Sequence, residues 1–158
     1  MDWGDFFYLS SESPSGLKWK VDKGRVRAGD NAITAIGNGY YKGRLNQVTV
    51  YAHRVVYFLA YGVKPEVIDH IDGDGLNNSI DNLRDGTTRQ NMQNRACKGY
   101  SYNKRDDVYY AQITKNGVTR HIGSFSTKES AIAAYLREKS LVHEFYNEER
   151  DICSSGKK

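Results

Sequence analysis

Asp69, His70, Asn82 and Asn91 are the residues of this 158-residue sequence whose types and spacing best fit a chemical reaction. All four fall in one stretch, residues 66–95, with the sequence EVIDHIDGDGLNNSIDNLRDGTTRQNMQNR. A neutral histidine can take a proton from water, because its unperturbed pKa is about 6.5. A carboxylate and an amide oxygen can hold a divalent cation and leave positions for phosphate oxygens. The group therefore predicts one-metal hydrolysis of a phosphodiester bond.

The neighbouring sequence indicates how these residues are positioned. A β-branched pair followed by a glycine-rich run predicts a short strand over 66–69, so that His70 lies where the strand gives way to a loop. Thr87 and Gln90 form a capping-box pattern, which predicts a helix that starts directly after Thr87 and carries Asn91 in its first turns. A strand end and a helix can then share one ion.

The stretch resembles the HNH endonuclease family over about residues 52–95, from AHRVVYFLAYG through DHIDGDGLNNSIDNLR. The resemblance implies a ββα-metal core, a β-hairpin and a helix around one Mg²⁺, with Mn²⁺ as an alternative. By matching position, Asp69 and Asn91 would be metal ligands, His70 the general base, and Asn82 the residue that ties down the loop and orients the site. The third signature position, often histidine, is asparagine here, as in proteins that resemble phage homing endonucleases.

Two features of this region have competing interpretations. The acidic loop over 72–81 partly imitates a calcium-binding loop, but His70 stands where that template needs an acidic first ligand. His53 matches a His-Arg pair that precedes the core in the family, yet a histidine on an apolar helix is more often a satisfied core residue. We therefore expect neither a calcium loop nor a catalytic role for His53.

Charge is unevenly distributed along the chain, which has a net charge of +4. Residues 84–121 contain eight Lys/Arg against three Asp/Glu, interleaved with tyrosines and amide side chains. A solvated surface is the usual explanation for a charge run. This mixture, however, suits phosphates, sugars and bases, so it predicts double-stranded DNA as the partner.

The cysteines and the N-terminal residues indicate the cellular compartment in which the protein is expected. Cys97 and Cys153 stand alone, without a CxxC pair or a set of four ligands for structural zinc, so we expect a reduced, cytoplasmic protein of a bacterial or phage-infected cell. The first residues, MDWGDFFYLS, lack the basic start and apolar core of a signal peptide. No run of about 18 apolar residues predicts a membrane span.

Residues 100–147 contain the signals of a second module. Three strand-like segments, 100–103, 109–114 and 119–125, surround the hairpin signal Asn116-Gly117. A helix should follow, with Ser126 and Glu129 as its capping box. Its expected apolar face consists of Ala131, Ala134, Tyr135, Val142 and Phe145.

This module resembles the AP2 DNA-binding domain over about residues 99–147, through YYAQI, IGSFST and the final FYN. The resemblance implies that the free face of the sheet enters the major groove of DNA. The strand positions expected to contact DNA are Tyr102, Lys104, Arg105, Tyr109, Gln112, Thr114, Arg120 and His121. Lys104 and Lys115 are expected to hold phosphates, and Arg84 or Arg89 to hold the DNA backbone near the nuclease core.

The sequence as a whole predicts a modular α+β protein with a β-rich N-terminal region, a ββα-metal nuclease core, and a three-stranded antiparallel sheet with one helix. The expected segments are a lead-in (1–52), the nuclease core (53–95), a linker (96–101), the AP2-like domain (102–147) and a basic tail (148–158).

The predicted function is that of a metal-dependent, site-specific nicking or homing endonuclease, with a monomer favoured and a dimer as the alternative. The alternative function is that of a sequence-specific DNA-binding regulator with an inactive HNH remnant. The survival of the expected ligands, base and loop asparagine argues against that alternative.

Overall fold

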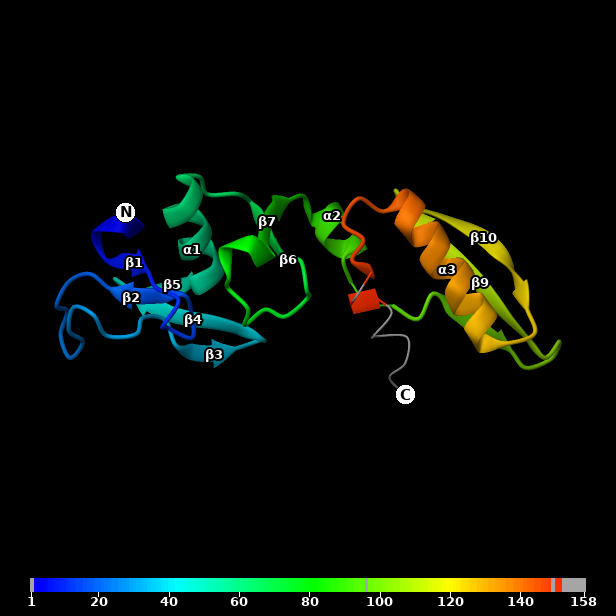
Figure 1. The fold of residues 1–158 in the computed structure, drawn as a ribbon, viewed down its shortest axis with the longest axis horizontal. Coiled ribbons are helices and arrows are strands. Elements are labelled where there is room, and N and C mark those ends of the chain that lie inside the picture. The colour runs from blue at the N-terminus through cyan, green and yellow to red at the C-terminus, as the bar shows by residue number, and fades with distance from the viewer. Residues whose placement is uncertain (1, 96, 149, 152–158) are drawn as a thin grey trace. The chain divides into compact units, whose positions relative to one another are not determined.

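The computed structural model describes residues 2–95, 97–148 and 150–151 and divides into two compact units, Met1–Gly86 and Thr87–Lys158. Its short helices and small antiparallel sheets confirm the predicted α+β class (Figure 1). None of the helices in the described part of the chain has the length and apolar character needed to cross a bilayer.

The first unit contains three small antiparallel sheets, formed by β1–β2, β3–β4–β5 and β6–β7. Its elements in chain order are η1 (Trp3–Asp5), β1 (Phe7–Leu9), β2 (Leu17–Trp19), β3 (Ala35–Gly37), β4 (Tyr40–Leu45), β5 (Val48–Tyr51), α1 (Ala52–Tyr61), β6 (Val67–His70), η2 (Ile80–Asn82) and β7 (Leu83–Gly86). The short N-terminal strands therefore match the predicted β-rich N-terminal region.

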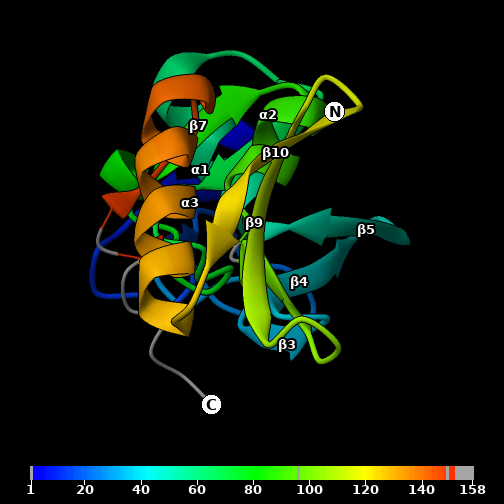
Figure 2. The same ribbon diagram turned by 90° about the vertical axis from the view of Figure 1, so that its right-hand side faces the viewer.

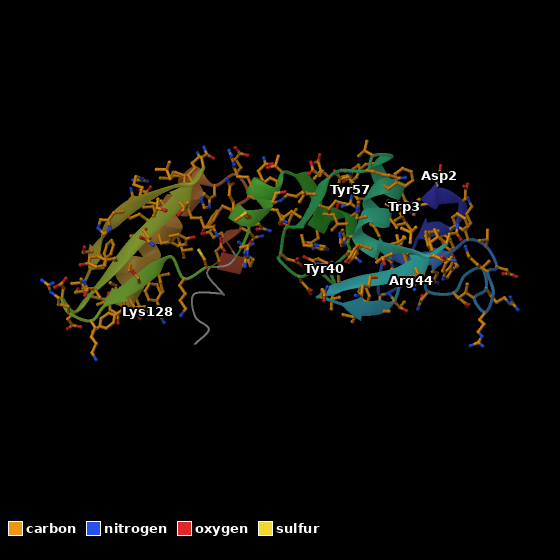
Figure 3. The ribbon with its side chains drawn as sticks, turned by 180° about the vertical axis from the view of Figure 1, so that it is seen from behind. Asp2, Trp3, Tyr40, Arg44, Tyr57 and Lys128 are labelled. Carbon is orange, nitrogen blue, oxygen red and sulfur yellow. The ribbon has the colours of Figure 1, made fainter. Side chains whose placement is uncertain are left out.

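Helix α1 is the centre around which the first unit packs. It ends at Gly62, whose left-handed backbone (φ 73°) lets its N–H donate to the Phe58 carbonyl. The Trp3 ring packs edge-on against Phe58, with ring centroids 5.5 Å apart (Figure 3). Phe7 and Leu17 from the N-terminal strands share one apolar core with α1 and with the β6–β7 hairpin. The N-terminal region therefore supports that hairpin directly.

The second unit is a three-stranded antiparallel sheet, in the order β10–β9–β8, with α3 covering one face (Figure 2). This architecture confirms the one predicted for the C-terminal part. Its elements are α2 (Thr88–Gln93), β8 (Tyr100–Asn103), β9 (Val108–Lys115), β10 (Val118–Phe125) and α3 (Lys128–Val142).

Two details predicted for α3 are wrong. The helix is capped by Thr127, whose side chain accepts from the Ser130 N–H at 3.2 Å, and not by Ser126 with Glu129. The helix ends at Val142, so Phe145 lies beyond it. Its buried face instead includes Lys139, whose ammonium lies 2.8 Å from the Asp151 carboxylate. A paired lysine can occupy an apolar face, which the apolar spacing alone does not reveal.

Gly75 marks a close approach between the loop after β6 and the turn before β4. A Cβ atom at this position would lie 2.4 Å from the Gly39 carbonyl oxygen and 2.7 Å from the Tyr40 ring. Backbone cannot move aside as a side chain can. The loop that follows His70 is therefore held against the β3–β4 sheet.

We predict that Gly75→Ala lowers the free energy of unfolding of the first unit by about 1 to 3 kcal/mol, because the added methyl group overpacks this contact. Urea unfolding followed by tryptophan fluorescence measures it, since both tryptophans, Trp3 and Trp19, lie in this unit. Gly37→Ala is the matched control, because its Cβ would meet only the flexible end of Lys42. Equal losses in the two variants would contradict the predicted loop contact.

Candidate active site

Asp69 and His70 are the last two residues of β6 and are both buried. In the antiparallel β6–β7 pair, Asp69 lies opposite Arg84 and His70 lies opposite Leu83. The prediction that His70 stands where a strand gives way to a loop is confirmed. A carboxylate and an imidazole are thus held at consecutive positions at the end of a paired strand.

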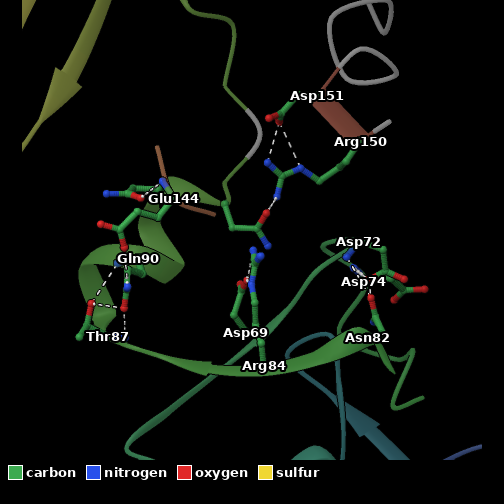
Figure 4. Close-up of polar contacts among 12 residues, drawn as sticks. Asp69, Asp72, Asp74, Asn82, Arg84, Thr87, Gln90, Glu144, Arg150 and Asp151 are labelled. Atoms are coloured by element: carbon green, nitrogen blue, oxygen red, sulfur yellow. Dashed lines mark hydrogen bonds and ion pairs between the residues drawn. The ribbon is translucent and has the colours of Figure 1, made fainter. Parts of the chain in front are cut away.

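Asn82 closes the loop that leaves this strand. Its Oδ1 accepts from the Asp72 N–H at 3.0 Å, and its Nδ2 donates to Asp72 Oδ1 at 2.9 Å and to the Asn77 carbonyl at 2.8 Å (Figure 4). These contacts match the tying role that the family resemblance implies for Asn82. Its effect on catalysis stays a prediction.

The acidic residues of this loop stabilise turns. Asp72 accepts from the Asp74 N–H at 2.8 Å and from Asn77 Nδ2 at 2.7 Å, and Asp74 accepts from the Leu76 N–H at 2.9 Å. Partial burial opposes ionisation of Asp72, but the hydrogen bonds from Asn77, Asp74 and Asn82 leave its pKa below the ordinary value. Within the described residues, no three His, Cys, Asp or Glu side chains gather into a metal cluster.

His70 is oriented by a buried chain of polar contacts that the sequence did not reveal. Its Nε2 lies 3.2 Å from Asn78 Oδ1, and Asn78 Nδ2 donates to the Ser15 carbonyl at 3.0 Å. Since an amide oxygen only accepts, Nε2 is the donor. In the neutral ring, Nδ1 is then the nitrogen that can accept a proton. No spacing rule links Ser15 to position 78, so sequence reasoning had no signal for this chain of contacts.

His53 lies beside His70 and is not the satisfied core residue that the sequence suggested. The two rings are 5.2 Å apart, and His53 also contacts the rings of Tyr40 (Figure 3) and Tyr51. Its Nδ1 is buried and has no hydrogen-bond partner within the described structure. Burial, and then the proximity of His70 and Arg54, lowers the pKa of His53 to about 4. The ring is therefore neutral at neutral pH.

Arg84, predicted to hold the DNA backbone, contacts Asp69. Its Nε and Nη2 lie 2.9 Å and 2.8 Å from the same carboxylate oxygen, Oδ2 (Figure 4). The guanidinium therefore neutralises the carboxylate expected to bind metal.

Asn91 belongs to the second unit, on α2. The predicted capping box is present, since Thr87 Oγ1 accepts from the Gln90 N–H at 3.2 Å and Gln90 Oε1 accepts from the Thr87 N–H at 2.8 Å (Figure 4). The helix thus begins as expected and carries Asn91 in its first turn. The pairing of Asn91 with Asp69 as metal ligands stays a prediction.

The free face of the second unit's sheet is polar. Ala111 and Ile113 are buried on the side of α3, so their neighbours Gln112 and Thr114 point to the opposite face. His121 pairs with Gln112 across the strands and lies on that same face. These three residues are where the prediction placed them.

Four other predicted DNA contacts lie elsewhere. Tyr109 packs against the core under α3, and Arg120, opposite Ile113, forms an ion pair with Glu138 of α3. Their expected position on the free face is therefore wrong, because strand alternation turns them to the covered face. Lys104 and Arg105 are exposed in the turn after β8, not on a strand.

Three predicted contacts lie at the margins of the sheet and on α2. Tyr102 lies opposite Tyr109 and therefore on the same covered side, so its expected position on the free face is also wrong. Its ring packs beside Tyr109, with ring centroids 4.9 Å apart, and its hydroxyl donates to Asp107 at 2.6 Å. Lys115 is the exposed last residue of β9. Arg89 Nη1 donates to Asn116 Oδ1 at 3.3 Å.

A groove of about 970 Å³ in this unit has three basic residues in its mostly apolar lining. Arg89, Arg95 and Lys98 contribute to it, and Gln112 and Thr114 join it from the sheet. It therefore brings cationic groups next to the polar face.

Cys97 is an exposed free cysteine whose sulfur lies 2.6 Å from the Tyr135 hydroxyl. Cys153 and the basic tail after residue 151 lie outside the described residues. The cytoplasmic location stays a prediction.

Comparison with known proteins supports the predicted likeness of the segment around Asp69 and His70 to HNH endonucleases. Residues 50–93 match the HNH endonuclease family model. The chain is 36% identical over 100 residues to an uncharacterised HNH endonuclease of Acanthamoeba polyphaga mimivirus, a match that covers 59% of this chain and 54% of that protein. It is 29% identical over 103 residues to Protein 3.8 of Escherichia phage T7, covering 59% of this chain and 85% of that protein. No solved structure matches.

The chain thus spans about half the length of the mimivirus relative. The family match ends at residue 93, so the likeness of the second unit to the AP2 domain stays a prediction. The predicted likeness of the nuclease segment to HNH endonucleases, and to viral members among them, is confirmed.

Proposed function

We propose that this protein is a metal-dependent DNA endonuclease whose reaction takes place at Asp69 and His70. The observation that carries the proposal is the buried pair of these residues at the end of β6, with the His70 ring oriented by Asn78. The pair lies within the segment that matches HNH endonucleases.

The chemistry of the Asp69 carboxylate suits one divalent cation of the Mg²⁺ type. Asp69 provides a buried carboxylate, and the second ligand proposed from the sequence, Asn91, provides an amide oxygen. Both are hard oxygen donors, which Mg²⁺ prefers, and so few protein ligands leave positions for water and phosphate. When bound, the cation would neutralise charge on the phosphate and on the leaving oxygen.

In this proposal His70 is the general base. With Nε2 donating to Asn78, the neutral ring accepts the proton of the attacking water at Nδ1. Asn78 cannot turn its amide without losing the Ser15 carbonyl as its second partner. The imidazole therefore keeps one orientation throughout the reaction, which lowers the cost of reaching the transition state.

The second unit is proposed to bind DNA through its free sheet face and the basic groove. The amide of Gln112 can make two hydrogen bonds with the edge of an adenine, and His121 and Thr114 add further donors and acceptors. Arg89, Arg95 and Lys98 suit phosphates, which contribute affinity without sequence preference. Binding by this unit would supply site specificity, and a monomer with one cleavage site would nick one strand.

We predict that His70→Ala and Asp69→Asn each abolish cleavage of supercoiled plasmid in Mg²⁺ and leave DNA binding within a few-fold. The first change removes the base, and the second replaces the negatively charged ligand with a neutral one. Conversion to open-circular product, with and without EDTA, measures cleavage, and fluorescence anisotropy measures binding.

Asp81→Asn is the matched control, because Asp81 is an exposed acidic residue of the same region that also belonged to the calcium-loop alternative. It should cut at the wild-type rate. Linear product would indicate paired cuts by a dimer. Normal cleavage by the His70 variant would reject the base assignment, and intact plasmid with retained DNA binding in the wild type would favour the regulator.

A second prediction concerns the sheet faces of the second unit. Gln112→Ala should change the sequence that the protein selects from a pool of random duplexes, at a cost of about 1 to 3 kcal/mol for the preferred base pair. Arg120→Ala should leave the selected sequence unchanged and lower stability by at most about 1 kcal/mol, because its partly exposed ion pair is screened by solvent. The reverse pattern would show that the covered face reads DNA.

A further inference from the structure

The Asp69–Arg84 pair spans the two strands of the β6–β7 hairpin. The two residues lie directly opposite each other in the register, and both guanidinium contacts go to one oxygen, Asp69 Oδ2. A guanidinium that donates from two nitrogens to a carboxylate forms a strong, charge-assisted contact.

Burial makes this contact necessary. The Asp69 side chain is 4% exposed and that of Arg84 is 24% exposed. A buried carboxylate is strongly unfavourable unless a positive charge or hydrogen-bond donors compensate it. Arg84 meets this need within the first unit itself, before any cation is present.

The contact between Arg84 and Asp69 opposes the binding of a metal ion to Asp69. A divalent cation bound to Asp69, through Oδ1 or Oδ2, would carry positive charge close to the guanidinium that contacts Oδ2. At such separations inside a protein the repulsion between like charges is substantial, because little water screens it. The cation and Arg84 therefore compete for one carboxylate.

We propose that Arg84 sets the affinity of Asp69 for its divalent cation, by holding the carboxylate in the metal-free protein and giving up part of that contact when metal binds. The inference rests on the proposed role of Asp69 as a metal ligand. Arg84 is in this view a positioning residue that keeps the site weakly metal-binding.

The test is a titration of the full chain with Mn²⁺, followed by electron paramagnetic resonance of the free ion, in a His70→Ala background without DNA. Arg84→Gln should bind Mn²⁺ at least about tenfold more tightly than its parent, which corresponds to about 1.4 kcal/mol. Arg54→Gln is the matched control. It removes the same charge from the same unit, but Arg54 donates to the Glu66 and Pro65 carbonyls.

Adding Asp69→Asn separates the possible results. A gain in Arg84→Gln that is lost on adding Asp69→Asn supports the proposal. If Asp69→Asn weakens Mn²⁺ binding but the Arg84 and Arg54 variants bind alike, the proposal is overturned and Asp69 remains a ligand. If Asp69→Asn leaves Mn²⁺ binding unchanged in every background, the ligand assignment is wrong and the proposal falls with it.

If Arg84→Gln does not fold, a second variant, Arg84→Lys, tests the proposal. Arg84→Lys keeps the charge but cannot donate from two nitrogens to Oδ2, so it should show a smaller gain in affinity. Far-ultraviolet circular dichroism and thermal melting establish that each variant is folded. A folded Arg84→Lys that binds Mn²⁺ no more tightly than its parent would overturn the proposal.

Discussion

The burial of two polar residues at the end of β6 is the constraint on which the rest of the site depends. Burying a carboxylate or an imidazole costs free energy unless partners compensate it. Asp69 finds Arg84 on the paired strand, and His70 finds Asn78 in the following loop. Each partner is supplied by a different segment. The hairpin register must be correct for Asp69 to meet Arg84, and the loop conformation must be correct for His70 to meet Asn78.

This constraint explains why the N-terminal region, which carries none of the proposed catalytic residues, matters for the chemistry. The Ser15 carbonyl fixes the amide that orients His70, and the turn at Gly39 and Tyr40 limits the loop at Gly75. Apolar residues of β1 and β2 share the core that also takes in the β6–β7 hairpin. The geometry of the site therefore extends far beyond the residues that identify the family.

Signals between neighbouring residues predicted helix starts and hairpins. Contacts between residues distant in sequence decided which partners the side chains have. The capping box at Thr87 and the hairpin signal at 116–117 depend on neighbouring residues, and both are present in the structure. The cap of α3 lies one residue away because two side chains there could serve, and it is Thr127, with an extended backbone, that accepts from the Ser130 N–H. The turning of Arg120 toward Glu138, and the contacts of Asn78 and Arg84, join residues distant in sequence, for which periodicity carries no information.

Stability alone does not account for the Asp69–Arg84 pair. A buried ion pair gains little over well-packed apolar residues of similar size, because desolvation offsets much of the attraction between its charges. Two cross-strand apolar side chains would hold a hairpin next to this core at least as well. The same reasoning applies to His53, whose buried Nδ1 lacks a partner although such an atom costs about 1 to 3 kcal/mol. Polar groups that a hairpin and a helix do not need for folding are concentrated around His70, and this concentration supports the reaction proposed there.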